Sequence, residues 1–394
     1  MKEEGKEKGK KITVAVPGAG GTVGGYVVKE LLAKDYAVIA IDRPGTLGHL
    51  RKMVEDGQDG LLVVELDLCD ENAISDCLCG SDGSDALGIG SADAVIFLAA
   101  DLDIRKTYDQ LKEINVNVPI RLYRALAKKL GKVFIHFSSG SIYADDGPYV
   151  LDEETRVEGK SGYEHSKIVS EDCLQMLAAQ EDAPKLIIVR PSLIYGPRGR
   201  FLASGVMVVP PLLQFLLNGF SPRISGGPKT NLVHAEDVAR AAVFLLENAD
   251  KVKSGEVFNV ADDTPMGFGE VVGAAVEAYG IDGKFGFPLP PAFLLAPLKR
   301  IIDTKLFFDI FDAPVDLVWW IIRKKYGIKA TFSARFEKEM APYFTKDTIF
   351  SNEKIKRLGF LFVYPSVHDG MKNVVAWYKD NKWIPRQVLP FWRL

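Results

Sequence analysis

The sequence predicts an α/β fold with a doubly wound parallel sheet, and three observations support this fold class. Short β-branched and apolar runs alternate with segments of helical periodicity over the first half of the chain. A glycine-rich turn directly follows the first apolar run and precedes the first helical segment. The part from about residue 284 to 345 lacks this alternation, which indicates an inserted substrate-binding section. The expected strands lie at residues 12–16, 38–41, 61–66, 94–100, 133–137 and 186–189.

The same patterns predict the organisation of the chain. Helices are expected at residues 111–130, 163–179, 233–249 and 367–379, where apolar residues recur at helical spacing. After residue 197 the chain becomes rich in proline, glycine and apolar side chains. We therefore predict a disordered tail over residues 1–11, a nucleotide-binding domain over residues 12–197 with a return of the chain at about 229–262, and a mainly substrate-binding part over residues 198–394.

Composition places the chain among ordinary globular proteins. Its 394 residues are 47% hydrophobic and 26% charged, and the net charge of −3 gives no basic surface for nucleic acid. The four cysteines show no paired spacing of the kind that binds a metal, so no metal site is predicted. Unpaired cysteines suit a reducing compartment, and we expect a cytoplasmic protein.

Two apolar stretches in the late part of the chain are too short to span a bilayer. They cover residues 287–298 and 315–322, and each fits either peripheral membrane contact or the lining of an apolar pocket. Aromatic side chains gather nearby, and they suit an apolar substrate or contact with a membrane surface. Packing in the C-terminal core explains any one of them equally well. These aromatic residues are Phe307, Phe308, Phe311, Trp319 and Trp320.

The glycine-rich turn has the spacing GxxGxxG and predicts a dinucleotide site. Gly18, Gly21 and Gly24 each remove a side chain where a phosphate or a strand must approach the backbone closely. The helix that opens near Thr22 and Val23 directs free N–H groups and the positive end of its dipole toward a pyrophosphate. Because this turn lies between a strand and a helix, dinucleotide binding is favoured over a purely structural turn.

An acidic residue at the end of the second strand bears on the choice of cofactor. The carboxylate of Asp42 can accept both hydroxyls of an adenosine ribose and would repel a 2′-phosphate, which favours NAD. Arg43 follows it and could receive that phosphate, so NADP stays open. Further cofactor contacts are expected at later strand ends, from Asp67 and Leu68 near the adenine and from Leu98, Ala99 and Ala100 beneath the cofactor.

Four polar residues form a candidate catalytic set. Tyr163 and Lys167 lie four residues apart on an expected helix, so both side chains project from one face. A lysine ammonium there favours the phenolate, which lets the tyrosine exchange a proton with an alcohol or ketone. Ser139 would hydrogen-bond the same substrate oxygen, and Asn115 could anchor a water that links the lysine to solvent. Lys167 and Tyr163 are also expected to contact the nicotinamide ribose region of the cofactor.

The order of these motifs resembles the extended short-chain dehydrogenase/reductase family. The motifs are PGAGGTVG, AVIFLAA, NVNV, FSSGSIYA, YEHSK, RPSLIYGP, LVHAEDVARA and FSNEKIKRLGF, and they cover nearly the whole chain. The resemblance implies a Rossmann-like domain that binds NAD(P), a smaller C-terminal substrate-binding part, and a homodimer formed through two helices per subunit. It also implies that Ser139, Tyr163, Lys167 and Asn115 are catalytic, and that Pro191 and Ile194 contact the cofactor.

Departures from subfamily patterns narrow the expected reaction. Sugar-nucleotide 4,6-dehydratases of the family carry an acidic pair after the catalytic serine or threonine, whereas Gly140 and Ser141 stand here, which disfavours dehydration. Many UDP-sugar epimerases carry an asparagine where Leu193 stands. The RPxxIYGP segment and the apolar section after residue 284 look more like the 3β-hydroxysteroid dehydrogenases and sterol-4-carboxylate 3-dehydrogenases of the family.

These observations leave three hypotheses. The leading one is an NAD(P)-dependent oxidoreductase that interconverts a secondary alcohol and a ketone, with a sterol-like or lipidic small molecule as substrate. The first alternative is an NAD-dependent sugar-nucleotide epimerase, which would use the same tyrosine. The second alternative is a non-catalytic nucleotide-binding protein, which the intact catalytic set disfavours.

Overall fold

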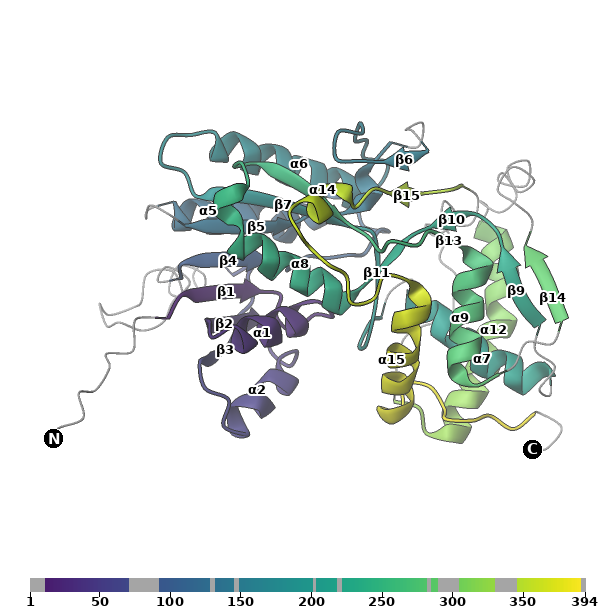
Figure 1. Ribbon diagram of the computed structural model, residues 1–394. Helices are drawn as coiled ribbons and strands as arrows, with labels where there is room; N and C mark the ends of the chain where they lie inside the picture. The colour runs from purple at the N-terminus through teal and green to yellow at the C-terminus, as the bar shows by residue number, and fades with distance from the viewer. Residues whose placement is uncertain are drawn as a thin grey trace. The chain divides into compact units, whose positions relative to one another are not determined.

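The chain forms two compact units in the computed structural model (Figure 1). The first unit comprises Met1–Ser138, Gly159–Val189 and Ala239–Val257, and the second comprises Ser139–Glu158, Arg190–Val238 and Phe258–Leu394. The structure describes residues 11–70, 92–127, 132–144, 149–200, 203–217, 222–281, 285–289, 305–329 and 346–390. Nearly all of the expected N-terminal tail lies outside these residues.

The first unit is built around a seven-stranded sheet with the order β12-β7-β5-β4-β1-β2-β3. The chain starts in the middle of the sheet, extends to one side through β2 and β3, and then returns to build the other side from β4. Neighbouring strands from β3 to β7 pair in parallel, which confirms the predicted doubly wound fold. The strands are β1 (Thr13–Pro17), β2 (Ala37–Asp42), β3 (Leu61–Glu65), β4 (Ala94–Phe97), β5 (Val133–Phe137), β7 (Lys185–Pro191) and β12 (Glu256–Val260).

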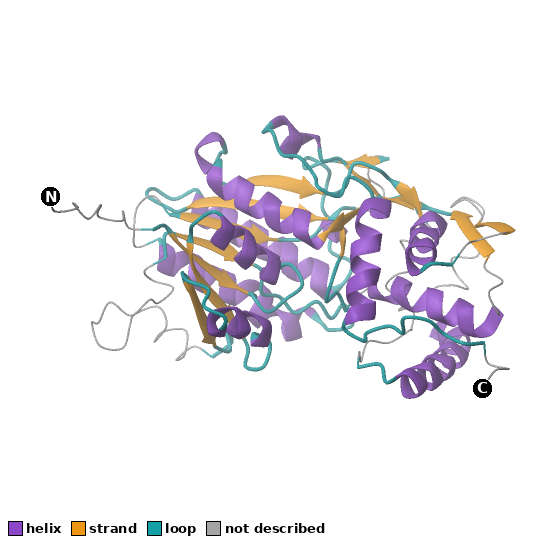
Figure 2. Ribbon diagram, turned by 60° about the horizontal axis from the view of Figure 1, so that its bottom comes forward, coloured by secondary structure: helices purple, strands orange, loops and turns teal. Residues whose placement is uncertain are grey.

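Helices flank this sheet (Figure 2). Alternate strand residues such as Val95, Phe134 and Ile188 point to one face and form a core with Leu122 and Leu174 of the covering helices. The helices are α1 (Gly24–Ala33), α2 (Gly48–Glu55), α4 (Tyr108–Lys112), the π-helical turn η2 (Glu113–Asn117), α5 (Val118–Leu126), α6 (Gly162–Ala178), α8 (Ala235–Glu247) and the 3₁₀ turn η4 (Ala249–Lys251).

The second unit combines short strand pairs with helices. The strands pair two by two: β8 (Leu193–Tyr195) with β11 (Leu232–His234), β9 (Pro222–Gly226) with β14 (Phe285–Leu289), β10 (Lys229–Thr230) with β13 (Met266–Gly267), and β6 (Val150–Leu151) with β15 (Ile349–Phe350). The helices are η3 (Gly140–Ile142), α7 (Ala203–Leu217), α9 (Phe268–Tyr279), α12 (Lys305–Tyr326), α14 (Glu353–Arg357) and α15 (Val367–Asp380).

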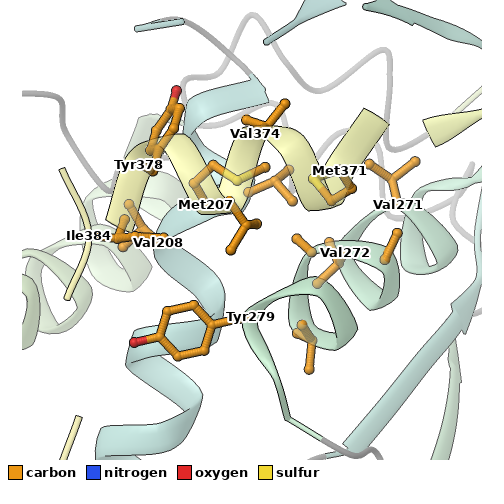
Figure 3. Packing of buried hydrophobic residues seen from close by; sticks show 14 of the residues in the cluster. Met207, Val208, Val271, Val272, Tyr279, Met371, Val374, Tyr378 and Ile384 are labelled. Carbon is orange, nitrogen blue, oxygen red and sulfur yellow. The ribbon is translucent and has the colours of Figure 1, made fainter. Parts of the chain in front are cut away.

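A separate apolar core holds the second unit together. Figure 3 shows Met207 of α7, Val272 of α9 and Met371 of α15 meeting in this core. Trp319 and Ile322 of α12 belong to the same cluster. Burial of these apolar surfaces drives the association of the helices, so the unit has its own source of stability.

Two sequence predictions for helices were wrong in part. The helix expected over residues 233–249 begins only at Ala235, because Val233 and His234 pair with Ile194 and Tyr195 in the β11–β8 ladder. The helix expected over residues 111–130 is interrupted by the π-helical turn η2 before α5. Within the part of the chain that the structure describes, no helix is long and apolar enough to cross a membrane.

Candidate active site

The glycine turn between β1 and α1 forms a cradle with little room for side chains. Gly18 has φ of +91°, and a Cβ added there would lie 2.5 Å from the backbone nitrogen of Ala99. A Cβ at Gly24 would lie 2.2 Å from the carbonyl oxygen of Gly18. At Gly21 the nearest atom would be that same oxygen at 3.2 Å, so the contact is milder. The protein's own packing therefore accounts for Gly18 and Gly24, while Gly21 is the position most open to a ligand.

Helix α1 begins at Gly24 in a way that suits an anion. Thr22 and Val23 precede the helix, Val23 makes no side-chain cap hydrogen bond, and the first turn carries no acidic residue. The backbone N–H groups of a helix start attract negative charge, and the helix dipole adds to this attraction. The start of α1 thus has the polarity that a pyrophosphate site needs, and binding of the pyrophosphate there remains a prediction.

Asp42 is the last residue of β2, and its carboxylate hydrogen-bonds the backbone of the glycine turn. Its Oδ2 accepts a hydrogen bond of 2.9 Å from the backbone N–H of Gly20, and its Oδ1 accepts one of 2.7 Å from the backbone N–H of Arg43. Each carboxylate oxygen has a second lone pair, so both can still accept a ribose hydroxyl. Gly20 was missed in the sequence, although its place inside the glycine turn was a usable signal.

The other predicted cofactor residues of the first unit fall at strand ends. Asp67 follows β3, and its Oδ1 accepts a 2.9 Å hydrogen bond from the backbone N–H of Cys69. Leu68 is buried in the apolar core, so its backbone rather than its side chain can face a ligand. The segment Leu98 to Ala100 follows β4, which ends at Phe97 instead of extending to Ala100. The backbone of Leu98 and Ala99 closes against Gly18.

Helix α6 carries the tyrosine and lysine of the candidate catalytic set. It begins with a capping box in which the Ser161 side chain accepts from the backbone N–H of Glu164 and the Glu164 side chain accepts from that of Ser161. The Lys167 Nζ lies 5.9 Å from the centroid of the Tyr163 ring, so the two side chains share one face of the helix. The sequence prediction that they project together agrees with this geometry.

The amine of Lys167 is buried and held at the end of a strand. Its Nζ donates a hydrogen bond of 2.8 Å to the carbonyl oxygen of Phe137, the last residue of β5. Loss of hydration on burial lowers the pKa of Lys167 to about 8, and the nearby Glu171 opposes this effect. The lysine therefore loses its charge at mildly alkaline pH, well below the usual range for this side chain.

Asn115 lies in the π-helical turn η2 and links two elements of the first unit. Its Oδ1 accepts from the backbone N–H of Asp101 at 2.9 Å, and its Nδ2 donates to the Asp101 carbonyl and to Ser166 Oγ, both at 3.0 Å. Ser166 in turn donates a 2.7 Å hydrogen bond to the carbonyl of Tyr163. The Asn115 amide thus steadies the start of α6, and a water relay through that amide remains a prediction.

Ser166 and Asp101 are site residues that sequence reasoning missed. Ser166 lies inside the YEHSK motif and is fully buried. Its position three residues after Tyr163 was the available signal, because a serine hydroxyl in a helix readily reaches a carbonyl of the preceding turn. Asp101 contacts Asn115 through its backbone, and its side-chain type gives no signal for such a contact.

Ser139 belongs to the second unit and opens η3. Its Oγ lies 2.9 Å from Ser141 Oγ and accepts a 3.2 Å hydrogen bond from the backbone N–H of Ser141. A Cβ at Gly140 would lie 2.6 Å from the ring of Phe350, so a carboxylate side chain has no room at this position. The local packing thus opposes an acidic residue at position 140, and the absence of dehydratase activity remains a prediction.

The remaining motif residues of the second unit build its framework. Pro191 ends β7, and Ile194 pairs with Val233 between β8 and β11. Tyr143 donates a 2.6 Å hydrogen bond to Asn259 Oδ1 and accepts one of 3.2 Å from Arg190. Contact of Pro191 and Ile194 with a cofactor remains a prediction. No group of three or more potential metal-binding side chains occurs among the residues that the structure describes.

Comparison with known proteins places this chain in a family. The model of the NAD dependent epimerase/dehydratase family matches residues 14–261, which include the glycine turn and the tyrosine–lysine helix. The chain belongs to this family.

Two named reductases are similar to this chain in sequence, and a solved structure is similar to it in fold. The chain is 27% identical over 266 residues to a dihydroflavonol 4-reductase of Zea mays, covering 62% of this chain and 70% of the relative. It is 29% identical over 255 residues to cinnamoyl-CoA reductase 1 of Arabidopsis thaliana, covering 60% and 67%. The fold is similar to that of UDP-glucuronic acid 4-epimerase from Bacillus cereus in complex with NAD, with a TM-score of 0.65, 18% identity, and coverage of 94% and 99%.

Proposed function

We propose that the protein is an NAD-dependent oxidoreductase that interconverts a secondary alcohol and a ketone on an apolar substrate. The observation that carries this proposal is the buried pair on α6, in which the Lys167 amine lies beside the Tyr163 ring and is anchored to Phe137. Such a pair supplies proton transfer at a carbonyl or alcohol oxygen. Reductases among the relatives support this reaction class.

Each residue of the set has a role in the proposed reaction. NAD would be held by the glycine turn and Asp42, and when bound it would supply hydride transfer to or from the substrate carbon. The Tyr163 hydroxyl gives its proton to the ketone oxygen, or its phenolate takes the alcohol proton in the reverse direction. The positive charge of Lys167 stabilises that phenolate. Ser139 donates a hydrogen bond to the same substrate oxygen and so stabilises the charge that develops there.

We infer a preference for NAD over NADP from the position of Asp42 beside the glycine turn of the first unit. A 2′-phosphate would stand against the carboxylate of Asp42, whereas ribose hydroxyls can donate to it. Both oxygens of Asp42 accept hydrogen bonds from backbone N–H groups, so the orientation of the side chain is fixed without a bound ribose. A preorganised acceptor of this kind favours NAD over NADP.

The test is the replacement of Tyr163 by Phe. We expect turnover to fall by about a thousandfold or more, because proton transfer by a positioned side chain contributes up to about 10⁴-fold. The Kd for NAD should stay within about twofold, since the ring keeps its place on α6. Reduced nicotinamide absorbance with a panel of hydroxysteroids, 3-hydroxy lipids and UDP-sugars measures turnover. A fully active Y163F variant would remove Tyr163 from the mechanism.

An epimerase is the second candidate, favoured by the similarity of the fold to sugar-nucleotide epimerases. Leu193 bears against it, because an aliphatic side chain cannot hydrogen-bond a sugar nucleotide. The same panel separates the two. Conversion of a UDP-sugar to its epimer without net formation of reduced nicotinamide favours the epimerase, whereas net reduction with an apolar alcohol favours the dehydrogenase.

A further inference from the structure

Helix α12 of the second unit is apolar on its buried face and also on its exposed face. Trp319 and Ile322 point into the core and are 2% and 0% exposed. On the opposite side, Leu317 is 59% exposed and Trp320 is 51% exposed. Residues three apart are neighbours on a helix surface, so these two large side chains form one exposed apolar strip.

Positive charge lies at the C-terminal end of this strip. The Nζ of Lys324 lies 4.3 Å from the centroid of the Trp320 ring, and Lys324 is exposed on the same side of the helix. Arg323, Lys325 and Lys329 follow closely in the sequence, so four basic residues stand against the single acidic residue Asp316, which directly precedes Leu317. We call the exposed set of Leu317, Trp320 and Lys324 the α12 outer face.

The C-terminal segment adds another exposed apolar side chain beside the end of α12. The backbone N–H of Leu389 donates a 2.8 Å hydrogen bond to the hydroxyl of Tyr326, the last residue of the helix. Leu389 is 44% exposed. Exposed apolar side chains therefore occur both on α12 and on the C-terminal segment that contacts the end of this helix.

We propose that the α12 outer face binds an anionic lipid surface. Tryptophan and leucine on a helix with lysines around them favour the boundary between headgroups and acyl chains, where each group finds its preferred surroundings. The lysines add attraction to anionic headgroups. A symmetric dimer through the same face would bring its lysines near their own copies, so charge favours a lipid surface over a second copy of this chain.

Co-sedimentation with lipid vesicles tests this proposal directly. The purified full-length protein is mixed with vesicles of phosphatidylcholine alone and with vesicles that also contain phosphatidylserine. We expect binding only to the anionic vesicles, and weaker binding as salt rises, because screening acts on the lysine contribution. The double variant Leu317→Ser/Trp320→Ser should bind at least about tenfold more weakly, and so should Lys324→Glu/Lys325→Glu.

A matched control and a mass measurement make the result decisive. Met176→Ser removes an apolar side chain of the first unit that is even more exposed, at 73%, and it should leave vesicle binding unchanged. The melting temperature and NAD affinity of each variant show that it is folded. No binding of the unmodified protein to anionic vesicles overturns the proposal, and so does unchanged binding of both double variants. If Leu317→Ser/Trp320→Ser instead halves the mass in solution, the face is an interface between two copies.

Because vesicle binding requires no turnover, this inference is independent of the proposed reaction. It extends the earlier expectation of peripheral membrane contact from two stretches of sequence to one helix face. The aromatic cluster in that expectation divides accordingly: Trp319 is core, whereas Trp320 is exposed. The side chains of Phe307, Phe308 and Phe311 lie outside the described part of α12.

Discussion

At the scale of single residues, the three glycines of the fingerprint serve different purposes. Gly18 combines a positive φ with direct contact to the backbone after β4, so both strain and collision oppose a side chain there. Gly21 has neither constraint to the same degree, since its φ is not positive and its nearest contact is at 3.2 Å. The fingerprint therefore mixes a requirement of the fold with a requirement of the ligand.

We expect Gly18→Ala and Gly21→Ala to separate these requirements. Gly18→Ala should lower the free energy of unfolding by about 2 kcal/mol or more, because it forces a left-handed backbone and a 2.5 Å contact. Gly21→Ala should leave that free energy within about 0.5 kcal/mol and weaken NAD binding at least about tenfold. Chemical denaturation and NAD titration measure the two quantities. Equal loss of stability in both variants would contradict this division.

Ser166 offers a second residue-scale prediction. Its hydroxyl bridges the Asn115 amide and the Tyr163 carbonyl, so Ser166→Ala leaves a buried amide hydrogen without this acceptor. We expect a loss of about 1 to 3 kcal/mol in the free energy of unfolding. Turnover should fall about tenfold, because Ser166 helps to position Tyr163 at the start of α6. KM should change little, because Ser166 itself does not contact the substrate.

Ser170→Ala is the matched control for Ser166→Ala. Ser170 is equally buried on α6, and its Oγ lies 3.3 Å from Nε2 of His136. The same atom is thus removed about one turn away, with no link to Tyr163. If both variants lose turnover to the same extent, general destabilisation of α6 explains the effect and Ser166 has no positioning role.

At the scale of elements, the strands were easier to predict than the helix that carries Asn115. Continuous apolar runs such as Val133 to Phe137 predicted the strands. A strand of a parallel sheet is buried on both faces, so nearly all of its residues must be apolar. The helical pattern around Asn115 predicted one continuous helix, yet the structure contains a π-helical turn. Pro119 explains it: proline has no N–H to bond the carbonyl of Asn115, and its ring would collide with that carbonyl in a regular helix.

The candidate site was predictable where the chemistry depends on spacing within one element. Tyr163 and Lys167 share a helix, so their common face followed from the sequence alone. The partners of Asn115 were not predictable, because they depend on the path of the loop after β4, which brings the backbone of Asp101 to the Asn115 side chain. Periodicity reports which face is buried, but it carries no information about which distant backbone group a buried amide will meet.

Helix α6 also allows a prediction about pH. The pKa of Lys167 is lowered to about 8 chiefly by loss of hydration, so its positive charge is present below that pH and is lost above it. Ketone reduction should therefore slow as the pH rises through about 8. A guanidinium keeps its charge over this range, so in Lys167→Arg the fall should move to higher pH or disappear. An unchanged alkaline fall in the residual activity of Lys167→Arg would assign it to another group.

At the scale of the whole molecule, successive segments of the chain belong alternately to the first and the second unit. It passes from one unit to the other after residues 138, 158, 189, 238 and 257. Strand β12 begins in the first unit and ends in the second. Neither unit is a continuous segment that could form before the other is synthesised, so we expect the two units to unfold in one cooperative step.

This expectation can be tested by tryptophan fluorescence, because the tryptophans that the structure describes lie in the second unit. They are Trp319, Trp320, Trp377 and Trp383, whereas the glycine turn belongs to the first unit. NAD at about 100 times its Kd should raise the free energy of unfolding by about 2.7 kcal/mol. We expect the midpoint from tryptophan fluorescence to move as far as the midpoint from circular dichroism. The Gly21→Ala variant, with weakened NAD binding, should show a smaller shift by both probes. A fluorescence midpoint that stays fixed while the other moves would show that the cofactor stabilises only the unit that binds it.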